Sequence, residues 1–416
     1  MAEPAFKRGY ASREVAPLAA SRPVRLAILC DMVEENWMSM DLVGEMLCEF
    51  LQRDHSDSFA TTRVVPRMRR RLTRLRSNSR SFFNGDRLVN RFWDYQRWLR
   101  YQKQEFDLFH VIDHSYGQLL HHLPPERTII TCHDLDTFRC LVEPQMELRS
   151  RFFRQMTRHV LRGFRKAALV VCDSVAIRDE LLARELIAPE RLRVAPLGVH
   201  PACTPKADLV ADAKAKRLLN HEQTNSVNLL HVGSTIKRKR IDVLLRVFAQ
   251  LRDRFAVRLI RVGGPFTGEQ MELVRQLKLE SDIVFLPYLQ RDVLAAVYRQ
   301  AALVLQPSEG EGFGLPVIEA MACGTPVVAS DLPVLREVGG EAAFYCPVAD
   351  VKAWSDSVNK LLSERQLLPA SWATRRAACL RQANSFSWSS YTQRMVSLYR
   401  EILSPPARYT IRGLGR

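Results

Sequence analysis

The sequence predicts an α/β protein with two domains, each built on a parallel sheet that helices cover on both faces. Its 416 residues exceed what one ordinary hydrophobic core holds. Short β-rich segments alternate with segments of helical periodicity, and this alternation predicts parallel strands joined by helical crossovers. The alternation stops at three prolines, Pro196, Pro201 and Pro205, and then starts again. Two domains joined near residue 200 are therefore expected.

The expected elements follow in chain order. In the first half we expect strands at residues 24–30, 107–112, 128–131, 167–172 and 193–195, with helices at 41–51 and 176–186. In the second half we expect strands at 227–232, 257–262, 283–286, 303–306 and 326–329. Helices are expected to begin at Ile241, Gly268, Arg291, Leu315 and Asp350, and a last helix to cover residues 389–403. In such sheets, ligands bind beyond the carboxyl ends of the strands.

Composition limits the class of protein. A hydrophobic share of 47% with 25% charged residues is typical of a folded globular chain. Nine scattered cysteines without a Cys-x-x-Cys pair predict reduced thiols in a cytoplasmic protein. We find no secretory signal at the start of the chain, and no apolar run long enough to span a bilayer. We therefore expect a cytoplasmic protein that is soluble or bound peripherally to the inner face of the membrane.

Much of the net charge of +16 lies in residues 63–100, which contain twelve arginines and two aspartates. The spacing of Val65, Met68, Leu72 and Leu75 predicts a helix with one apolar stripe. This helix would be either a solvated cover of the domain core or an interfacial helix on an anionic membrane surface. Nucleic acid is an unlikely partner, because no signature of a nucleic-acid-binding fold accompanies the arginines.

Residues 308–330, SEGEGFGLPVIEAMACGTPVVAS, contain the strongest motif. The segment predicts a glycine loop after a strand, then a helix from Leu315. Gly312 and Gly314 would let backbone N–H groups approach a ligand, and the positive end of the helix suits a diphosphate. Glu319 has two acceptor oxygens that match a vicinal diol such as a ribose, and Glu311 is placed to hold a sugar ring.

Other interpretations of these motifs fit less well. A dinucleotide-binding fingerprint would need a third glycine where Leu315 stands, and Glu311 would repel the pyrophosphate. A structural turn with exposed acids does not explain the glycines and the proline together. Asp134-Leu135-Asp136 spells the Asp-x-Asp of metal-dependent transferases, but we expect Asp134 to follow a strand without binding a metal.

The Glu-x7-Glu spacing from Glu311 to Glu319 resembles the signature of the retaining family-4 glycosyltransferases of GT-B architecture, and residues 320–330 continue that resemblance. Further segments resemble the family's diphosphate-binding loop (230–245), a strand end (262–265), the base-reading segment (285–289), the interdomain crossover (196–199), the His-Asp strand end (131–135) and the start of the final helix (386–388).

The resemblance implies two Rossmann-like domains whose parallel sheets face a central cleft. We expect a loose leader at 1–22, an acceptor-side domain at 23–200 and a nucleotide-sugar-binding domain at 201–385. Residues 386–416 would form a helix that crosses back to the first domain, with a basic tail. The implied activity is transfer of a hexosyl group from a nucleotide diphosphate-sugar to a glycan or lipid-linked glycan, with retention, as in polysaccharide biosynthesis. A nucleotide-sugar isomerase (epimerase) on the same architecture is the alternative.

The resemblance also assigns site residues, with no cofactor and no metal. His133 and Glu311 would be catalytic. Donor contacts would come from Gly233, Ser234, Arg238, Lys239, Gly312, Phe313, Gly314, Leu315 and Glu319. Two features depart from the family: Ser234 stands where a basic residue is usual, so that Arg238 or Arg240 would have to compensate, and residues 31–37 replace a Gly-Gly turn.

Overall fold

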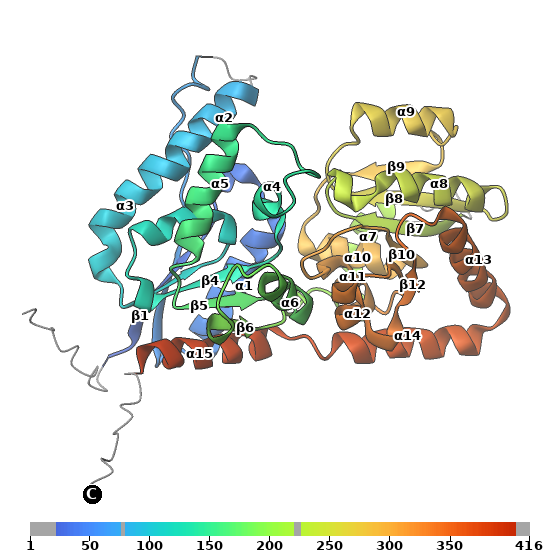
Figure 1. Cartoon of the computed structure of the whole chain (residues 1–416). Helices are drawn as coiled ribbons and strands as arrows, with labels where there is room; N and C mark the ends of the chain where they lie inside the picture. Colours follow the sequence, from blue (N-terminus) through green and yellow to red (C-terminus); the bar gives the residue numbers. More distant parts are fainter. Residues whose placement is uncertain (1–21, 76–79, 220–225, 405–416) are drawn as a thin grey trace, which may run out of the picture.

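The computed structural model describes residues 22–75, 80–219 and 226–404. The leader predicted at 1–22, except for its last residue, and the basic tail beyond residue 404 lie outside the described residues. The described chain contains two six-stranded parallel sheets, which Figure 1 shows side by side with helices around each. The predicted α/β class with two parallel sheets is confirmed.

The first sheet has the strand order β2-β1-β3-β4-β5-β6, and all its pairings are parallel. Its strands are β1 (Val24–Leu29), β2 (Phe59–Val64), β3 (Leu108–Val111), β4 (Thr128–Cys132), β5 (Leu169–Cys172) and β6 (Leu192–Val194). The helices of this half are α1 (Met38–Asp54), α2 (Arg80–Val89), α3 (Tyr95–Gln102), α4 (Arg139–Val142), α5 (Arg151–Phe164) and α6 (Val175–Ala183). The strands at its centre are buried along their whole length, which matches their continuous apolar sequences.

The second sheet has the order β12-β11-β10-β7-β8-β9 and is also parallel. Its strands are β7 (Val227–Val232), β8 (Val257–Val262), β9 (Ile283–Leu286), β10 (Leu303–Gln306), β11 (Val327–Ser330) and β12 (Phe344–Cys346). The helices are α7 (Leu209–Leu218), α8 (Ile241–Arg252), α9 (Gly268–Gln276), α10 (Arg291–Gln300), α11 (Leu315–Ala322), α12 (Pro333–Gly339), α13 (Val351–Leu367), α14 (Pro369–Ala383) and α15 (Trp388–Leu403).

Local sequence signals set several helix starts. Ser174, Thr267 and Asp350 each cap a helix by accepting a backbone N–H with the side chain. Thr267 forms a full capping box with Gln270. Pro333 and Pro369 occupy the first turns of α12 and α14, where a missing N–H costs nothing.

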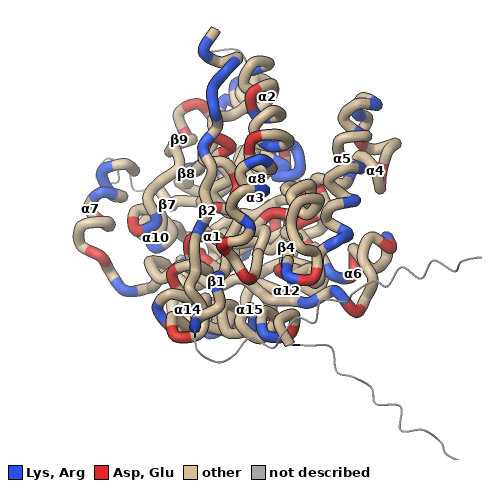
Figure 2. The backbone as a smooth tube through the Cα atoms, turned by 90° about the vertical axis from the view of Figure 1, so that its left-hand side faces the viewer, with Lys and Arg blue, Asp and Glu red and all other residues tan. Residues whose placement is uncertain are grey.

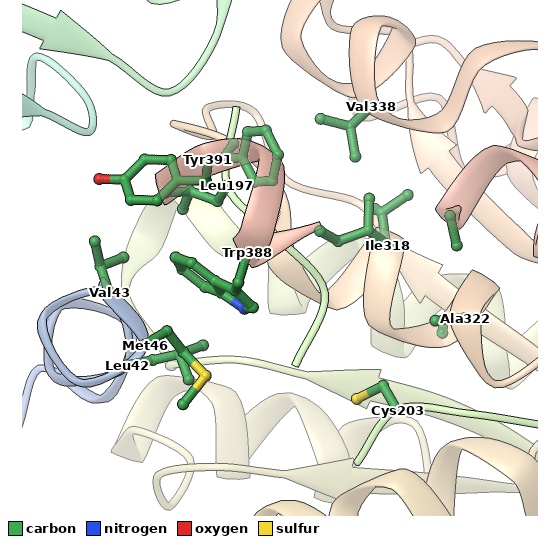
Figure 3. Close-up of a cluster of buried hydrophobic side chains, with 14 of the residues drawn as sticks. Leu42, Val43, Met46, Leu197, Cys203, Ile318, Ala322, Val338, Trp388 and Tyr391 are labelled. Carbon is green, nitrogen blue, oxygen red and sulfur yellow. The ribbon is translucent and has the colours of Figure 1, made fainter. Parts of the chain in front are cut away.

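The last helix, α15, leaves the second half of the chain and packs on α1 of the first, along the lower edge of Figure 1. Its first residue, Trp388, is buried in one hydrophobic cluster with Met46 of α1, Leu197 of the linker and Ile318 of α11. Figure 3 shows these side chains converging from both halves. The division into domains, with a boundary near residue 200 and a final segment from residue 386 that crosses back, stays a proposal, which the contact of α15 with α1 supports.

Residues 65–75 form no helix, so the helix predicted from the apolar stripe is wrong. Two buried side chains of the following segment hold these residues as an extended loop. Asp86 accepts the backbone N–H groups of Arg71, Leu72 and Thr73, and the hydroxyl of Thr73 as well. The side chain of Asn90 bonds both the N–H and the carbonyl of Arg69. These long-range bonds replace the helical ones that the spacing predicted.

Within the described residues, no helix is long and apolar enough to cross a membrane. All nine cysteines are free and buried.

Candidate active site

The carboxyl ends of both sheets bring the site residues together. His133 directly follows β4, and Asp173 directly follows β5. From the second half, the loop 233–240 follows β7 and the glycine loop 307–314 follows β10. The two halves touch here, because the hydroxyl of Ser174 donates to the carbonyl of Gly312 at 3.2 Å. The geometry thus places the predicted residues of both halves around one interface.

Two glycines of the loop are required by geometry. A Cβ at Gly312 would lie 1.9 Å from the carbonyl oxygen of His133, so any side chain would push the two halves apart. Gly314 has φ +97°, a left-handed conformation that favours glycine. Between them Phe313 is buried and meets Phe386 edge-on, with ring centroids 5.8 Å apart. The loop therefore holds one fixed shape against the first half.

The glycine loop leads directly into α11, whose N-terminus has no side-chain cap. Gly314 is the N-cap residue, Pro316 in the first turn has no N–H, and the Val317 N–H donates to the Gly314 carbonyl at 2.8 Å, so Leu315 carries the first backbone N–H that this helix end offers to a ligand. Such a helix end carries partial positive charge and suits an anion such as a diphosphate.

Lys239 and Glu311 form a buried ion pair beside this helix end. The Lys239 ammonium lies 2.7 and 2.8 Å from the two carboxylate oxygens of Glu311. Glu311 Oε1 also accepts from the amide of Gln306 at 2.6 Å and from the hydroxyl of Ser308 at 2.7 Å. An ammonium has three N–H donors, so Lys239 keeps one for another acceptor, and Glu311 keeps acceptor capacity on Oε2.

The electrostatics of Glu311 follow from these partners. Burial favours the protonated acid, but Lys239, Arg238 and the hydroxyl of Ser308 outweigh it and lower the pKa of Glu311 to about 2. The carboxylate is therefore ionised throughout the neutral range. An ionised, buried carboxylate with acceptor capacity left on Oε2 is able to accept a further hydrogen bond from a sugar ring.

Arg238 connects the two halves of the site. Its guanidinium donates to the carbonyl of Gly310 at 2.7 Å and lies 3.3 Å from Asp134 and 2.6 Å from Asp136. The pair Asp134 and Asp136, which spells a metal-binding motif, thus binds a guanidinium of the other half. The absence of a metal requirement stays a prediction.

The two candidates for the missing basic residue at Ser234 differ in direction. Arg238 lies 3.6 Å from Glu311 Oε2 and so belongs to the site. Arg240 pairs instead with Asp242 and Glu309, at 2.8 and 3.3 Å. Of the two, we propose Arg238 as the replacement.

Glu319 lies in the helix that the glycine loop opens, one turn past its start. Its side chain is 3% exposed and accepts from the Tyr298 hydroxyl at 3.1 Å and from Arg291 at 3.4 Å, one partner on each oxygen. Burial raises the pKa of Glu319, and Arg291 and Tyr298 oppose that rise. Each oxygen keeps capacity for a further donor, as a diol requires.

His133 is held on both ring nitrogens by its own half of the chain. Nδ1 lies 2.5 Å from Asp173 Oδ2, and Nε2 lies 2.8 Å from the carbonyl oxygen of Ile112. Burial disfavours the charged ring, but Asp173 and Asp113 outweigh it and raise the pKa of His133 to about 9. The sequence predicted His133 at the strand end but not the aspartate beside it.

Sequence reasoning missed several other residues around the site. Asp173 had a usable signal, since it follows a predicted strand at its carboxyl end as His133 does. Glu337 of α12 had none: it accepts the N–H groups of Val175 and Ala176 and so caps α6 across the interface, a partnership that only the tertiary arrangement creates.

Comparison with known proteins agrees with this geometry. Residues 43–202 match the family described as Glycosyltransferase Family 4, and residues 226–364 match Glycosyl transferases group 1. The chain belongs to the retaining family-4 glycosyltransferases and has the GT-B fold. It is therefore a nucleotide-sugar-dependent glycosyltransferase. The isomerase alternative is set aside on this ground.

The individual relatives share about a third or less of their residues with this chain. The chain is 28% identical to O-antigen chain mannosyltransferase B of Escherichia coli over 73% of this chain and 78% of that protein. It is 32% identical to the D-inositol 3-phosphate glycosyltransferase of Mycobacterium sp. strain KMS, over 56% of this chain and about half (53%) of that protein's length.

Among solved structures, sucrose-phosphate synthase from Thermosynechococcus elongatus superposes with a TM-score of 0.71 at 20% identity, covering 91% of this chain and 99% of that one. Anabaena HepE, solved in complex with UDP and glucose, superposes with a TM-score of 0.69 at 16% identity, covering 91% and 100%. At these identities the likeness shows the fold.

Proposed function

We propose that this enzyme transfers a hexose from a nucleoside diphosphate sugar to a hydroxyl group of a glycan or lipid-linked glycan, without a divalent metal ion. The observation that carries this proposal is the buried Lys239–Glu311 pair beside the uncapped N-terminus of α11. Together they offer positive charge for a departing diphosphate and an anionic acceptor for a sugar ring.

The chemistry needs two kinds of stabilisation. As the glycosidic bond to the diphosphate breaks, negative charge grows on the phosphate oxygens and positive charge on the anomeric carbon. The third N–H of Lys239, the Arg238 guanidinium and the positive N-terminal end of α11 would stabilise the phosphate charge at fixed positions. Glu311 Oε2 would accept a ring hydroxyl and orient the sugar, and Glu319 would hold the ribose diol.

The names of similar proteins also support the proposed donor. HepE is described in complex with UDP and glucose, and the Escherichia coli relative is a mannosyltransferase of the O-antigen chain. These names support a nucleotide-linked glucose or mannose as donor and a growing polysaccharide as acceptor. The nine free, buried thiols support a reducing compartment, and we propose the cytoplasmic side of the membrane as its place of work.

A thermal-shift series tests the donor site. UDP, GDP and ADP, each alone and as glucose or mannose conjugates, would be added to the wild-type protein. A nucleotide at about a hundred times its dissociation constant stabilises by about 2.7 kcal/mol, so one base should raise the melting temperature by several degrees. The conjugate that binds would then be incubated with lipid-linked glycan acceptors. If no nucleotide diphosphate shifted the transition, the donor-site proposal would be wrong.

We further propose that the arginine-rich face within residues 63–100 contacts an anionic membrane surface. Figure 2 shows basic residues gathered beside α2. Among the described residues of 63–100, the exposed arginines are Arg67, Arg69, Arg70, Arg71, Arg74, Arg80, Arg97 and Arg100. Among them Leu75 is 79% exposed and Trp93 is 65% exposed. Exposed apolar and aromatic side chains surrounded by arginines are typical of surfaces that enter the headgroup layer.

Flotation with vesicles tests the membrane contact. The protein should float with phosphatidylglycerol vesicles at low salt, detach as salt rises, and ignore phosphatidylcholine vesicles. Trp93→Gln with Leu75→Gln should weaken the binding severalfold. Leu209→Gln is the matched control, because Leu209 is 86% exposed in the other half. Equal recovery with neutral and anionic vesicles would contradict the proposal.

A further inference from the structure

His133 and Asp173 form a pair whose geometry requires a charged ring. Both partners of the His133 ring, the Asp173 carboxylate and the Ile112 carbonyl, only accept hydrogen bonds. A neutral imidazole carries one N–H and is able to serve only one of them. With both nitrogens 2.5 and 2.8 Å from acceptors, the arrangement fits an imidazolium. Both side chains are buried, so bulk water does not screen the interaction.

The pair lies directly against the glycine loop of the other half. The carbonyl of His133 contacts Gly312 so closely that a Cβ would not fit between them. Ser174, the neighbour of Asp173, donates its hydroxyl to the Gly312 carbonyl, and the same hydroxyl caps α6. His133 and Asp173 thus support the loop from which α11 begins. Moreover, the other oxygen of this carboxylate, Asp173 Oδ1, is buried without a hydrogen-bond partner among the described residues. The burial of Asp173 is therefore not explained by full hydrogen bonding of its own carboxylate.

We propose that Asp173 is a positioning residue, which holds His133 as a doubly hydrogen-bonded cation beneath the glycine loop, where its charge stabilises the departing diphosphate. This inference rests on the proposed transferase function and adds a residue to it. Asp173 acts through His133, which would be the group nearer the donor.

Other titratable groups near His133 do not replace Asp173. Those facing it are Asp113 from the loop after β3, His110 from β3, and Asp134 next to it in the chain, which is bound by Arg238. Burial and, to a lesser extent, the nearby His133 together lower the pKa of His110 to about 3, so His110 stays neutral. Asp113 is engaged by the N–H and hydroxyl of Ser115. Among the described residues, Asp173 is the only ionisable group that bonds the His133 ring.

Histidine NMR with pH-dependent kinetics tests the inference. The His133 ring resonance, assigned with His133→Gln, should titrate near pH 9 in the wild type. In Asp173→Asn its midpoint should fall by at least two pH units. Transfer by the wild type should be level from pH 6 to 8, whereas Asp173→Asn should lose about tenfold per pH unit above its new midpoint and recover in acid. Asp179→Asn is the control, since Asp179 is exposed on α6 and pairs with Arg178.

Two results would overturn the inference. One is a wild-type His133 midpoint at or below 6.5, a measurement that does not depend on the folding of any variant. The other is an Asp173→Asn enzyme that is slower by the same factor at every pH, because a purely structural role predicts that outcome. Failure of the transferase function itself would appear differently: His133 would still titrate near pH 9 in the wild type, but no nucleotide diphosphate would stabilise the protein.

Discussion

Replacing Glu319 by glutamine tests where the nucleotide lies. In the structure the carboxylate is almost fully buried and is shared by Tyr298 and Arg291, one on each oxygen. Glutamine keeps one oxygen as acceptor but turns the other into a donor. A ribose diol that needs two acceptor oxygens would then lose one charge-assisted hydrogen bond. Such a bond contributes roughly 1.5–3 kcal/mol, so affinity should fall on the order of tenfold to a hundredfold.

The loss should be the same for the bare nucleotide diphosphate and for the whole sugar donor, because both contain the ribose. Glu311→Gln should differ, leaving the bare nucleotide within a few-fold of wild type and reducing mainly turnover. Glutamine is preferred to alanine at both sites. Truncation of Glu319 would leave the Tyr298 hydroxyl buried without a partner, and such a group costs roughly 1–3 kcal/mol of stability.

Isothermal titration calorimetry of both variants against nucleotide and nucleotide-sugar provides the assay. Glu309→Gln is the control, because Glu309 lies in the same loop but is more exposed and pairs with Arg240. If Glu319→Gln binds the bare nucleotide as tightly as wild type, Glu319 only complements the helix end. The placement of the ribose would then be refuted.

Three further outcomes are expected. The buried Lys239 and Arg238 lower the pKa of Glu311 against the opposing effect of burial, so this carboxylate should contribute stability above about pH 4.5 that is lost as the pH falls toward 2. Between these pH values, the unfolding free energy of Glu311→Gln should therefore drop less than that of wild type, by about 3 kcal/mol. Equal drops in the two proteins, measured by urea denaturation at each pH, would contradict this. EDTA should leave turnover unchanged, whereas loss restored by Mn²⁺ would revive a metal role for Asp134 and Asp136. Glu337→Gln should weaken the contact between the halves and raise protease sensitivity of the interface; an unchanged cleavage rate would show that this cap does not hold the closed arrangement.

Much of the fold could be predicted because local patterns and packing agree. The strands 227–232 and 303–306 were predicted at their observed limits, since buried parallel strands are uninterrupted apolar segments bounded by turn residues. One edge strand of each sheet was missed. β2 (Phe59–Val64) contains three consecutive polar residues, Thr61, Thr62 and Arg63, and β12 (Phe344–Cys346) is very short, so neither stands out in sequence.

The sequence predicted the motif residues of the candidate site but not the side chains that bond to them. Glu311 and Glu319 were identified by spacing and resemblance, yet their partners come from residues far along the chain, such as Lys239 and Tyr298. The helix prediction for the arginine-rich segment was wrong for the same reason. Its apolar spacing suits a helix, but Asp86 captures the backbone of residues 71–73, and long-range bonds of this kind leave no local signal.

The most direct test of the account is the anomeric configuration of the product. The donor identified by thermal shift would be incubated with a lipid-linked glycan in EDTA, and the product's anomeric coupling measured by proton NMR. The account predicts a new glycosidic bond with the same configuration as the donor, formed only when acceptor is present. An inverted bond, or conversion of the sugar nucleotide without acceptor, would contradict it.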